Sequence, residues 1–301
     1  MKRLLSDGWT QVFLAIAVVA GGLCLLGGGV QIDLPSMPSL GGGAVAPAAV
    51  PAPAPAAPAS AQAPGRPKDG KAWVVDPAGG ADADAATLTQ AIALAAPGDA
   101  IVLRRGTHRD SAVVDKKVRI FGEGKLGETV LAGVSDFALS IRAERVSVTN
   151  LAVAAPKGPH ASAVAVAHGG SLGFFDSSAD GQDALAALVV EGAVLSSGSS
   201  FSSTGSAVVS RDGQALFTGG SLVSPERGVL AGGPAALVRL DSALVRGAKA
   251  AGEAIASGGI SFVNCRFDGV AEICWTSDGG TCGRGPQAAR EPNVPSAAAF
   301  R

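Results

Sequence analysis

The 301-residue chain carries a formal net charge of -1, and only 16% of its residues are charged. This removes the basic surface that binding to a phosphate backbone requires, so nucleic acid is excluded as a partner. Forty-two glycines, 4% aromatic residues and no tyrosine, beside 47% hydrophobic residues, describe small residues and short aliphatic strands rather than a helical bundle.

The first predicted element is a membrane-spanning helix within residues 9–32, a stretch that contains no charged residue. Its apolar core, residues 12–30, would be about 29 Å long as a helix, which is enough to cross a bilayer. Lys2 and Arg3 precede it, so the N-terminus is expected in the cytoplasm and the rest of the chain in the periplasm or extracellular space. A cleaved signal peptide is the alternative, although its apolar region would be only roughly 7–15 residues long.

The composition divides the chain into four segments. Residues 1–33 form a cytoplasmic stub and membrane anchor, and residues 34–70 a Pro/Ala/Gly-rich spacer whose prolines exclude helix and sheet. Residues 71–283 form the folded domain, and residues 284–301, again rich in proline, alanine and polar residues, are expected to be a disordered tail.

The folded domain opens with a predicted helix that begins after Thr87, a suitable N-cap. Leu88, Ala91, Ile92 and Ala95 share one face of this helix. A solenoid needs its first coil covered, so we expect the helix to be an amphipathic cap.

Short apolar runs then restart about every 22 residues, which is typical of a solenoid. They lie at residues 163–166, 187–190, 207–209, 228–230 and 254–256. Each run is followed by a turn, a second apolar run and a third short element. Three short strands per repeat of this length predict an all-β right-handed parallel β-helix, with alternate side chains pointing into a continuous core.

Three cysteines follow the predicted anchor and therefore lie outside the membrane, where oxidation is permitted. Because three is an odd number, one of them stays free. Cys274 and Cys282, on either side of a Gly-Gly turn, are the favoured pair, and Cys265 is interpreted as a small core residue.

Two parts of the domain resemble the pectinesterase branch of the pectin lyase-like superfamily. The opening, through residues 85–92, 98–109 and 118–124, is similar to a capping helix that leads into strands and a Gly-x-Gly corner. Residues 162–185 are similar to the pectinesterase segment that ends in Gly-x-Gln-Asp-Thr-Leu, here Gly-Gln-Asp-Ala-Leu at residues 181–185. The resemblance implies a β-helix and, for an active member, ester hydrolysis by two carboxylates with glutamine donors to the oxyanion.

The resemblance assigns the general acid/base to Asp183 and an oxyanion donor to Gln182. The rest of the set is degenerate, because the first oxyanion glutamine falls on Ser162 and the nucleophilic aspartate falls near Ser206. A serine without a base is a poor nucleophile, and Asp212, the nearest carboxylate, comes about six residues late.

Asp176, Asp180 and Trp275 are the candidate ligand-binding residues, with a solvated polar corner and packing over the last coil as the simpler interpretations. The three histidines have no cysteine or acidic partner at ligand spacing, so neither a metal nor a cofactor is expected.

The sequence therefore favours a non-catalytic, membrane-tethered β-helix that binds or organises a polysaccharide or protein of the cell envelope. The alternative is a carbohydrate-active enzyme, either a diverged pectinesterase-like esterase or a polysaccharide lyase, that uses Asp183.

Overall fold

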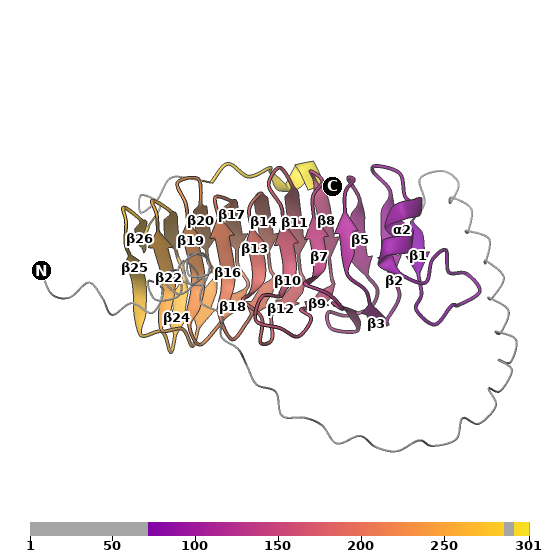
Figure 1. Ribbon diagram of the computed structural model, residues 1–301, viewed down its shortest axis with the longest axis horizontal. Coiled ribbons are helices and arrows are strands. Elements are labelled where there is room, and N and C mark those ends of the chain that lie inside the picture. The colour runs from indigo at the N-terminus through magenta and orange to yellow at the C-terminus, as the bar shows by residue number, and fades with distance from the viewer. Residues whose placement is uncertain (1–71, 286–291, 301) are drawn as a thin grey trace, which may run out of the picture. The chain divides into compact units, whose positions relative to one another are not determined.

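The computed structural model describes residues 72–285 and 292–300. They form an all-β, right-handed parallel β-helix of about eight coils, as predicted. Each coil contributes a strand to each of three sheets, here called A, B and C, and neighbouring strands pair in parallel (Figure 1).

Sheet A has ten strands: β1 (Trp73–Val75), β2 (Ala100–Leu103), β5 (Arg119–Gly122), β8 (Val146–Thr149), β11 (Ser171–Phe175), β14 (Ala193–Ser197), β17 (Gln214–Thr218), β20 (Leu237–Asp241), β23 (Gly259–Val263) and β26 (Thr281–Arg284). Sheet B has eight: β3 (Gly106–Arg109), β6 (Thr129–Ala132), β9 (Ala152–Ala154), β12 (Ser178–Asp180), β15 (Ser200–Ser202), β18 (Ser221–Val223), β21 (Leu244–Arg246) and β24 (Arg266–Asp268). Sheet C also has eight: β4 (Ala112–Val114), β7 (Phe137–Ile141), β10 (Ser162–Val166), β13 (Ala186–Val190), β16 (Ser206–Arg211), β19 (Arg227–Gly232), β22 (Ala250–Ile255) and β25 (Glu272–Thr276).

The strand register confirms the predicted repeat. Equivalent positions at the start of sheet C are 20 to 24 residues apart: Ser162, Ala186, Ser206, Arg227, Ala250 and Glu272. One run was predicted out of register: Ala254 and Ile255 do lie in sheet C, in β22, but they pair with Ala231 and Gly232 and not with the run at 228–230. Val229 pairs with Gly252, so β22 begins earlier, at Ala250. Gly252 and Glu253 interrupt the apolar run and hide the strand from a hydrophobicity pattern.

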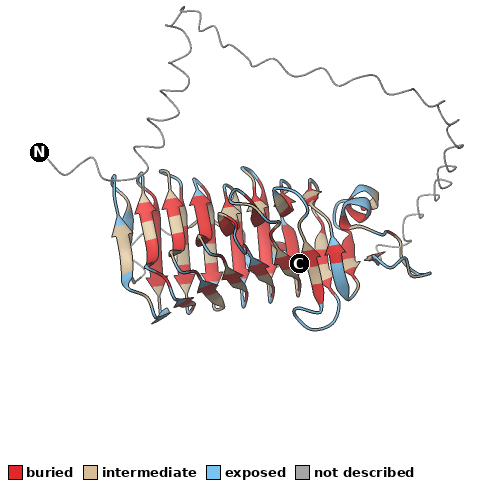
Figure 2. Cartoon of the chain, turned by 60° about the horizontal axis from the view of Figure 1, so that its bottom comes forward, coloured by how far each residue is buried: buried red, intermediate tan, exposed pale blue. Residues whose placement is uncertain are grey.

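The core lies inside the three sheets and consists of stacked aliphatic and aromatic side chains. Figure 2 shows the buried residues along the strands of successive coils. Val164, Leu188, Val208 and Val229 occupy one column of sheet C and are 0% exposed. Phe174, Phe201 and Phe217 form a second stack, with ring centroids 5.5 and 5.4 Å apart. Offset and edge-on aromatic pairs add about 0.5–1.5 kcal/mol each beyond the area they bury.

The corner between sheets A and B has a left-handed residue in successive coils. The positive φ angles belong to Asn150 (55°), Asp176 (45°), Gly198 (66°), Gly219 (67°), Ser242 (57°) and Asn264 (52°). Glycine, asparagine and aspartate tolerate this conformation best, which explains the polar turn residues in the sequence. The side-chain amide of Asn150 also donates to the carbonyls of Gly122 and Gly124, at 2.8 and 2.7 Å, and so links two coils.

The helix α2 spans Leu88–Leu94 and lies beside β1 and β2 (Figure 1). The Thr87 hydroxyl accepts a hydrogen bond from the Gln90 amide at 3.2 Å. Leu88, Ala91 and Ile92 are buried, and the helix contacts β1, β2 and β4.

The expectation of a disordered tail over 284–301 is wrong for two parts of that range. Arg284 belongs to β26, and residues 292–300 have a defined position on sheet A, ending in the 3-10 turn η2 (Ala297–Phe300). Phe300 is only 2% exposed. The composition of this segment indicated a tail because a single aromatic residue, Phe300, has little effect on the average, although the sheet can bury its side chain. Residues 286–291 and 301 lie outside the described residues.

The predicted anchor at 9–32 and the predicted spacer at 34–70 also lie outside the described residues. Within 72–285 and 292–300, the structure contains no helix with the length and apolar character needed to cross a bilayer.

Candidate functional site

Asp183 and Gln182 lie in the turn between β12 and β13, and both are exposed. Neither side chain makes a hydrogen bond or ion pair with any residue of the described part of the chain. Gln182 contributes its main chain instead, since its carbonyl accepts from the Thr204 hydroxyl at 3.0 Å. An oxyanion donor has to be held in place before the reaction, and nothing described holds this amide.

The positions that matched the other catalytic residues lie on the adjacent strands of sheet C. Ser162 and Ser206 stand in one column, with Ala186 in the coil between them. Asp183 comes three residues before Ala186, in the turn that leads into the sheet. Ser162 and Ser206 are two coils apart, about 9.6 Å, which is too far for a shared hydrogen bond.

Asp212 does not complete this set either. It follows β16, whereas Ser206 begins β16, so the two residues lie at opposite ends of a six-residue strand. At about 3.3 Å per residue this separates them by roughly 20 Å. Asp212 instead accepts a hydrogen bond from the Ala235 amide, at 3.2 Å, on the next coil.

Asp176 precedes β12, whereas Asp180 is the last residue of that strand. Asp180 faces the Gln182 turn, where its carboxylate accepts from the Gln182 amide and from the Ser202 hydroxyl, both at 3.0 Å. These bonds give Asp180 a structural role. Asp176 lies at the corner between sheets A and B and is not brought together with Asp183.

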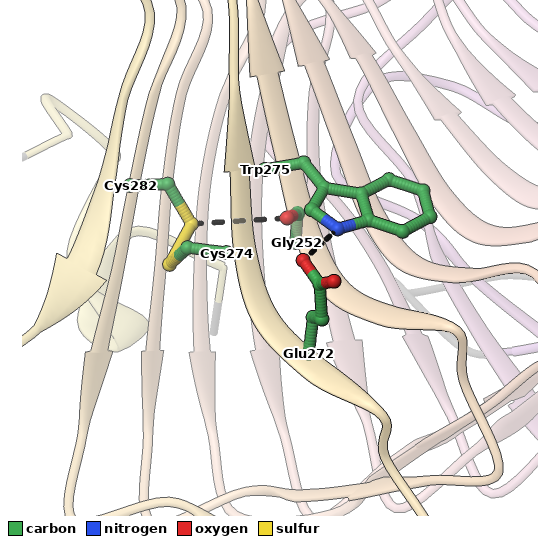
Figure 3. Close-up of a disulfide and its surroundings, with 5 residues drawn as sticks. All are labelled: Gly252, Glu272, Cys274, Trp275 and Cys282. Atoms are coloured by element: carbon green, nitrogen blue, oxygen red, sulfur yellow. Dashed lines mark hydrogen bonds between the residues drawn. A yellow bond between two sulfur atoms is a disulfide. The ribbon is translucent and has the colours of Figure 1, made fainter.

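Trp275 is far from all of these residues. It belongs to β25, which lies four coils beyond β13, a separation of about 19 Å. Its indole N–H donates to the Glu272 carboxylate, and its ring is partly exposed (Figure 3). Trp275 and Asp183 therefore do not share one small-ligand site.

Cys274 and Cys282 form a disulfide that joins β25 to β26 in the last coil, with Cα atoms 5.6 Å apart (Figure 3). Gly252 on the preceding coil leaves space for it, since a Cβ there would lie 3.2 Å from the Cys282 sulfur.

Cys265 is the free cysteine of the described residues. Burial raises the pKa of its thiol, so it is a weak nucleophile at neutral pH. Its sulfur lies 3.3 Å from the Val263 carbonyl and 3.4 Å from the Leu240 carbonyl. In an earlier coil, the Ser199 hydroxyl donates to the carbonyls of Ser197 and Phe174. These residues precede Ser199 by two and twenty-five positions, as Val263 and Leu240 precede Cys265. Cys265 thus occupies a position of the repeat that serine fills elsewhere.

The sequence interpretation missed two hollows on sheet A. The first, of about 710 Å³, lies where the turns from sheet C enter sheet A. Ionisable side chains of successive coils line it: Glu144, Arg145, His168, Glu191 and Asp212. The signal was present in the sequence as an ionisable residue before a glycine, at residues 168–169, 191–192 and 212–213. No group of His, Cys, Asp or Glu side chains suitable for a metal ion occurs among the described residues.

The second hollow, of about 460 Å³, lies on the outer face of sheet A. Phe121, Thr149 and Phe175 stand in one column of that face, and Arg119 and Asp176 flank it. Phe300 closes the hollow on one side. Both hollows are therefore bounded in part by residues 292–300.

Comparison with known proteins supports the fold. The chain matches no protein-family model and no curated protein sequence. Among solved structures it resembles pectin methylesterase PemA from Erwinia chrysanthemi, with a TM-score of 0.56 and 18% identity over 67% of this chain and 80% of that one. The deglycosylated pectin methylesterase from Aspergillus niger gives 0.57 and 15% identity over 73% and 85%. The carrot enzyme gives 0.51 and 12% identity over 75% and 89%. The chain thus shares its right-handed parallel β-helix fold with these pectin methylesterases.

Proposed function

We propose that the chain is a non-catalytic β-helix, held outside the cytoplasmic membrane, that binds or organises a polysaccharide or protein of the cell envelope. The observation that carries this proposal is the isolation of Asp183. It stands exposed in a turn and has neither a hydrogen bond nor an ion pair with another described residue.

Ester hydrolysis by paired carboxylates needs a nucleophile and a general acid/base that converge on one carbonyl group. The column beside Asp183 offers Ser162, Ala186 and Ser206, none of which is a carboxylate. A serine there would need a base within hydrogen-bond reach, and Asp212 lies at the far end of its strand. The arrangement favours a scaffold over an esterase.

The alternative is a carbohydrate-active enzyme that uses Asp183, and the likeness to pectin methylesterases is what favours it. Methanol release from methyl-esterified pectin separates the two proposals. We expect no release above background from the full-length protein or from Asp183→Ala. Release by the wild-type protein that disappears in Asp183→Ala would establish the esterase and remove the non-catalytic proposal.

The same proposal includes a membrane tether, made of an anchor and a spacer. Its support is the uncharged segment at 9–32, with Lys2 and Arg3 before it, and the proline-rich stretch at 34–70. We expect the chain to fractionate with membranes, and the β-helix to be digested by protease added to the exported side of intact cells. Recovery of a shortened chain in the soluble exported fraction would show a cleaved signal peptide instead.

We also propose that α2 caps the first coil. Its support is the burial of Leu88, Ala91 and Ile92 against the first strands of sheets A and C. Without such a cover, the apolar end of the core would face water.

A further inference from the structure

Residues 292–300, here called the strap, run back along sheet A toward earlier coils (Figure 1). At one end, the Asn293 amide donates to the side-chain carbonyl of Gln214 on β17. At the other end, η2 contacts β11, which lies two coils away. Val294 and Pro295, between these ends, and Ala299, within η2, line the first hollow. The strap therefore lies on the solenoid as an extended peptide ligand would.

A socket in β11 receives the aromatic ring of Phe300. Its floor is Gly173, where a Cβ would lie only 2.7 Å from the Phe300 ring. Its wall is Phe175, whose ring stands edge-on to Phe300 with centroids 6.2 Å apart. The residues paired with Gly173 in the neighbouring coils are Ser147 and Leu195. This position of the strand therefore accepts a side chain in other coils, and glycine is the exception. The missing side chain makes the space that Phe300 fills.

The strap leaves much of the surrounding surface unfilled. Hollows of about 710 and 460 Å³ remain on its two sides. The first hollow is lined by three carboxylates, those of Glu144, Glu191 and Asp212, together with the guanidinium of Arg145 and the imidazole of His168. The strap places uncharged residues there. A peptide with basic residues at those positions would add favourable electrostatic contacts that the strap lacks.

We propose that this face of sheet A is a groove for a peptide segment of a partner protein, and that the strap occupies it as an internal competitor. The partner segment carries one aromatic side chain for the socket and basic residues several positions before it, over the first hollow. The proposal rests on the proposed binding function and specifies its site and the class of partner.

The test uses full-length protein and a fluorescent synthetic peptide of residues 292–301. The strap of wild-type protein competes at the high effective concentration of an attached segment. Phe300→Ala removes the buried ring and so weakens the binding of the strap to sheet A. We therefore expect the peptide to bind this variant at least about tenfold more tightly than wild type. Equal affinity for the two proteins, measured by fluorescence anisotropy, would overturn the proposal.

Gly173→Leu is the matched control because it also releases the strap but fills the socket. The three atoms nearest to a Cβ at this position belong to the rings of Phe175 and Phe300 and not to the main chain, so we expect the strand to keep its backbone. We expect this variant to bind the peptide at least about tenfold more weakly than Phe300→Ala. Binding as tight as in Phe300→Ala would place the peptide elsewhere and overturn the socket. Far-UV circular dichroism confirms that both variants are folded.

The class of partner is tested with a second peptide, in which Asn293 and Val294 are both replaced by lysine. We expect it to bind Phe300→Ala more tightly than the native peptide, with an advantage that shrinks as salt rises from about 0.05 to 0.5 M. A lysine peptide that binds no better would overturn the basic-segment assignment. Displacement of the native peptide by pectin oligosaccharides, but not by the lysine peptide, would assign the groove to a polysaccharide instead. The methanol assay is independent of the strap, so the groove and the non-catalytic function fail separately.

Discussion

The middle of the solenoid and its last coil come from the same repeat but are held together differently. In the middle, Phe201 lies between two other rings and is 1% exposed. In the last coil, Phe267 is only partly buried; it meets Phe262 on one side and the guanidinium of Arg284, 5.0 Å from its ring, on the other. Figure 2 shows the contrast, with buried strands in the middle and partly or fully exposed strands at the end that β25 forms.

The difference follows from the number of neighbours a coil has. A middle coil buries its apolar side chains against a coil on each side, whereas the last coil has one such neighbour. In the last coil the Cys274–Cys282 disulfide adds a covalent link, and exposed ion pairs such as Arg246–Asp268, at 2.9 Å, and Lys249–Glu226, at 2.7 Å, join neighbouring later coils.

The largest expected loss of stability comes from a substitution in the middle coils of the solenoid. Phe201→Ala removes the central ring of the stack and leaves a cavity, so we expect a loss of about 3–5 kcal/mol in the free energy of unfolding. Val223→Ala, at a residue 38% exposed in the next coil of sheet B, is the control and should change stability by no more than about 0.5 kcal/mol. Urea denaturation measures both. A loss below about 1 kcal/mol for Phe201→Ala would mean that the stack does not hold the middle coils together.

Loss of the Cys274–Cys282 disulfide should have the next largest effect on stability. Replacing Cys274 and Cys282 together by alanine removes an eight-residue closure, worth about 2.5 kcal/mol of chain entropy. Because the last coil has one neighbour, we expect the loss as local opening, seen as faster amide hydrogen exchange in β25 and β26 with unchanged exchange in β13 and β16. Uniformly faster exchange would show that the solenoid unfolds as one unit.

The other end of the solenoid gives a smaller effect. Thr87→Ala removes the hydroxyl that accepts from the Gln90 amide and should cost about 1 kcal/mol. Thr87→Ser keeps an acceptor and should be close to wild type. If α2 caps the first coil, Thr87→Ala will also accelerate hydrogen exchange in β1 and β2. Acceleration confined to α2 would contradict the capping proposal.

The smallest effect concerns the ion pair of Glu226. Its hydrogen bond from Lys249 holds the pKa of this carboxyl below the usual value of 4.5. The stabilisation is therefore present above about pH 4.5 and is lost as the pH falls through the lower folded-state pKa. Lys249→Gln should return the pKa toward 4.5, as measured by NMR titration, and should flatten the stability profile only in that acidic range. Because the pair is exposed, both changes should shrink in high salt. An unchanged Glu226 pKa in Lys249→Gln would show that the lysine does not act on it.

Most of the fold could be predicted from the sequence because a solenoid repeats a local pattern. Apolar runs, glycine turns and a period of about 22 residues are visible without tertiary information. The pattern failed at Gly252 and Glu253, where the strand persists through main-chain pairing to Val229 and Leu230 without an apolar run of its own. A strand between two paired neighbours does not need its own hydrophobic signal.

The candidate site was less accessible from sequence. Asp183 and Gln182 were identified by resemblance, but only the positions of β13 and β16 show that Asp183 stands before the column of Ser162 and Ser206 rather than in it. Likewise Cys265 was interpreted from the sequence as an apolar core residue, and only the tertiary structure shows that its sulfur contacts two carbonyls as the Ser199 hydroxyl does.

The sequence by itself determined the repeat, the three-strand coil and the helix after Thr87, because these depend on side-chain periodicity and local caps. The tertiary structure alone decided which turns meet in the hollows of sheet A and where Phe300 lies. Those contacts join residues far apart along the chain, and their strength comes from a fit between one ring and the space above Gly173 that no local pattern encodes.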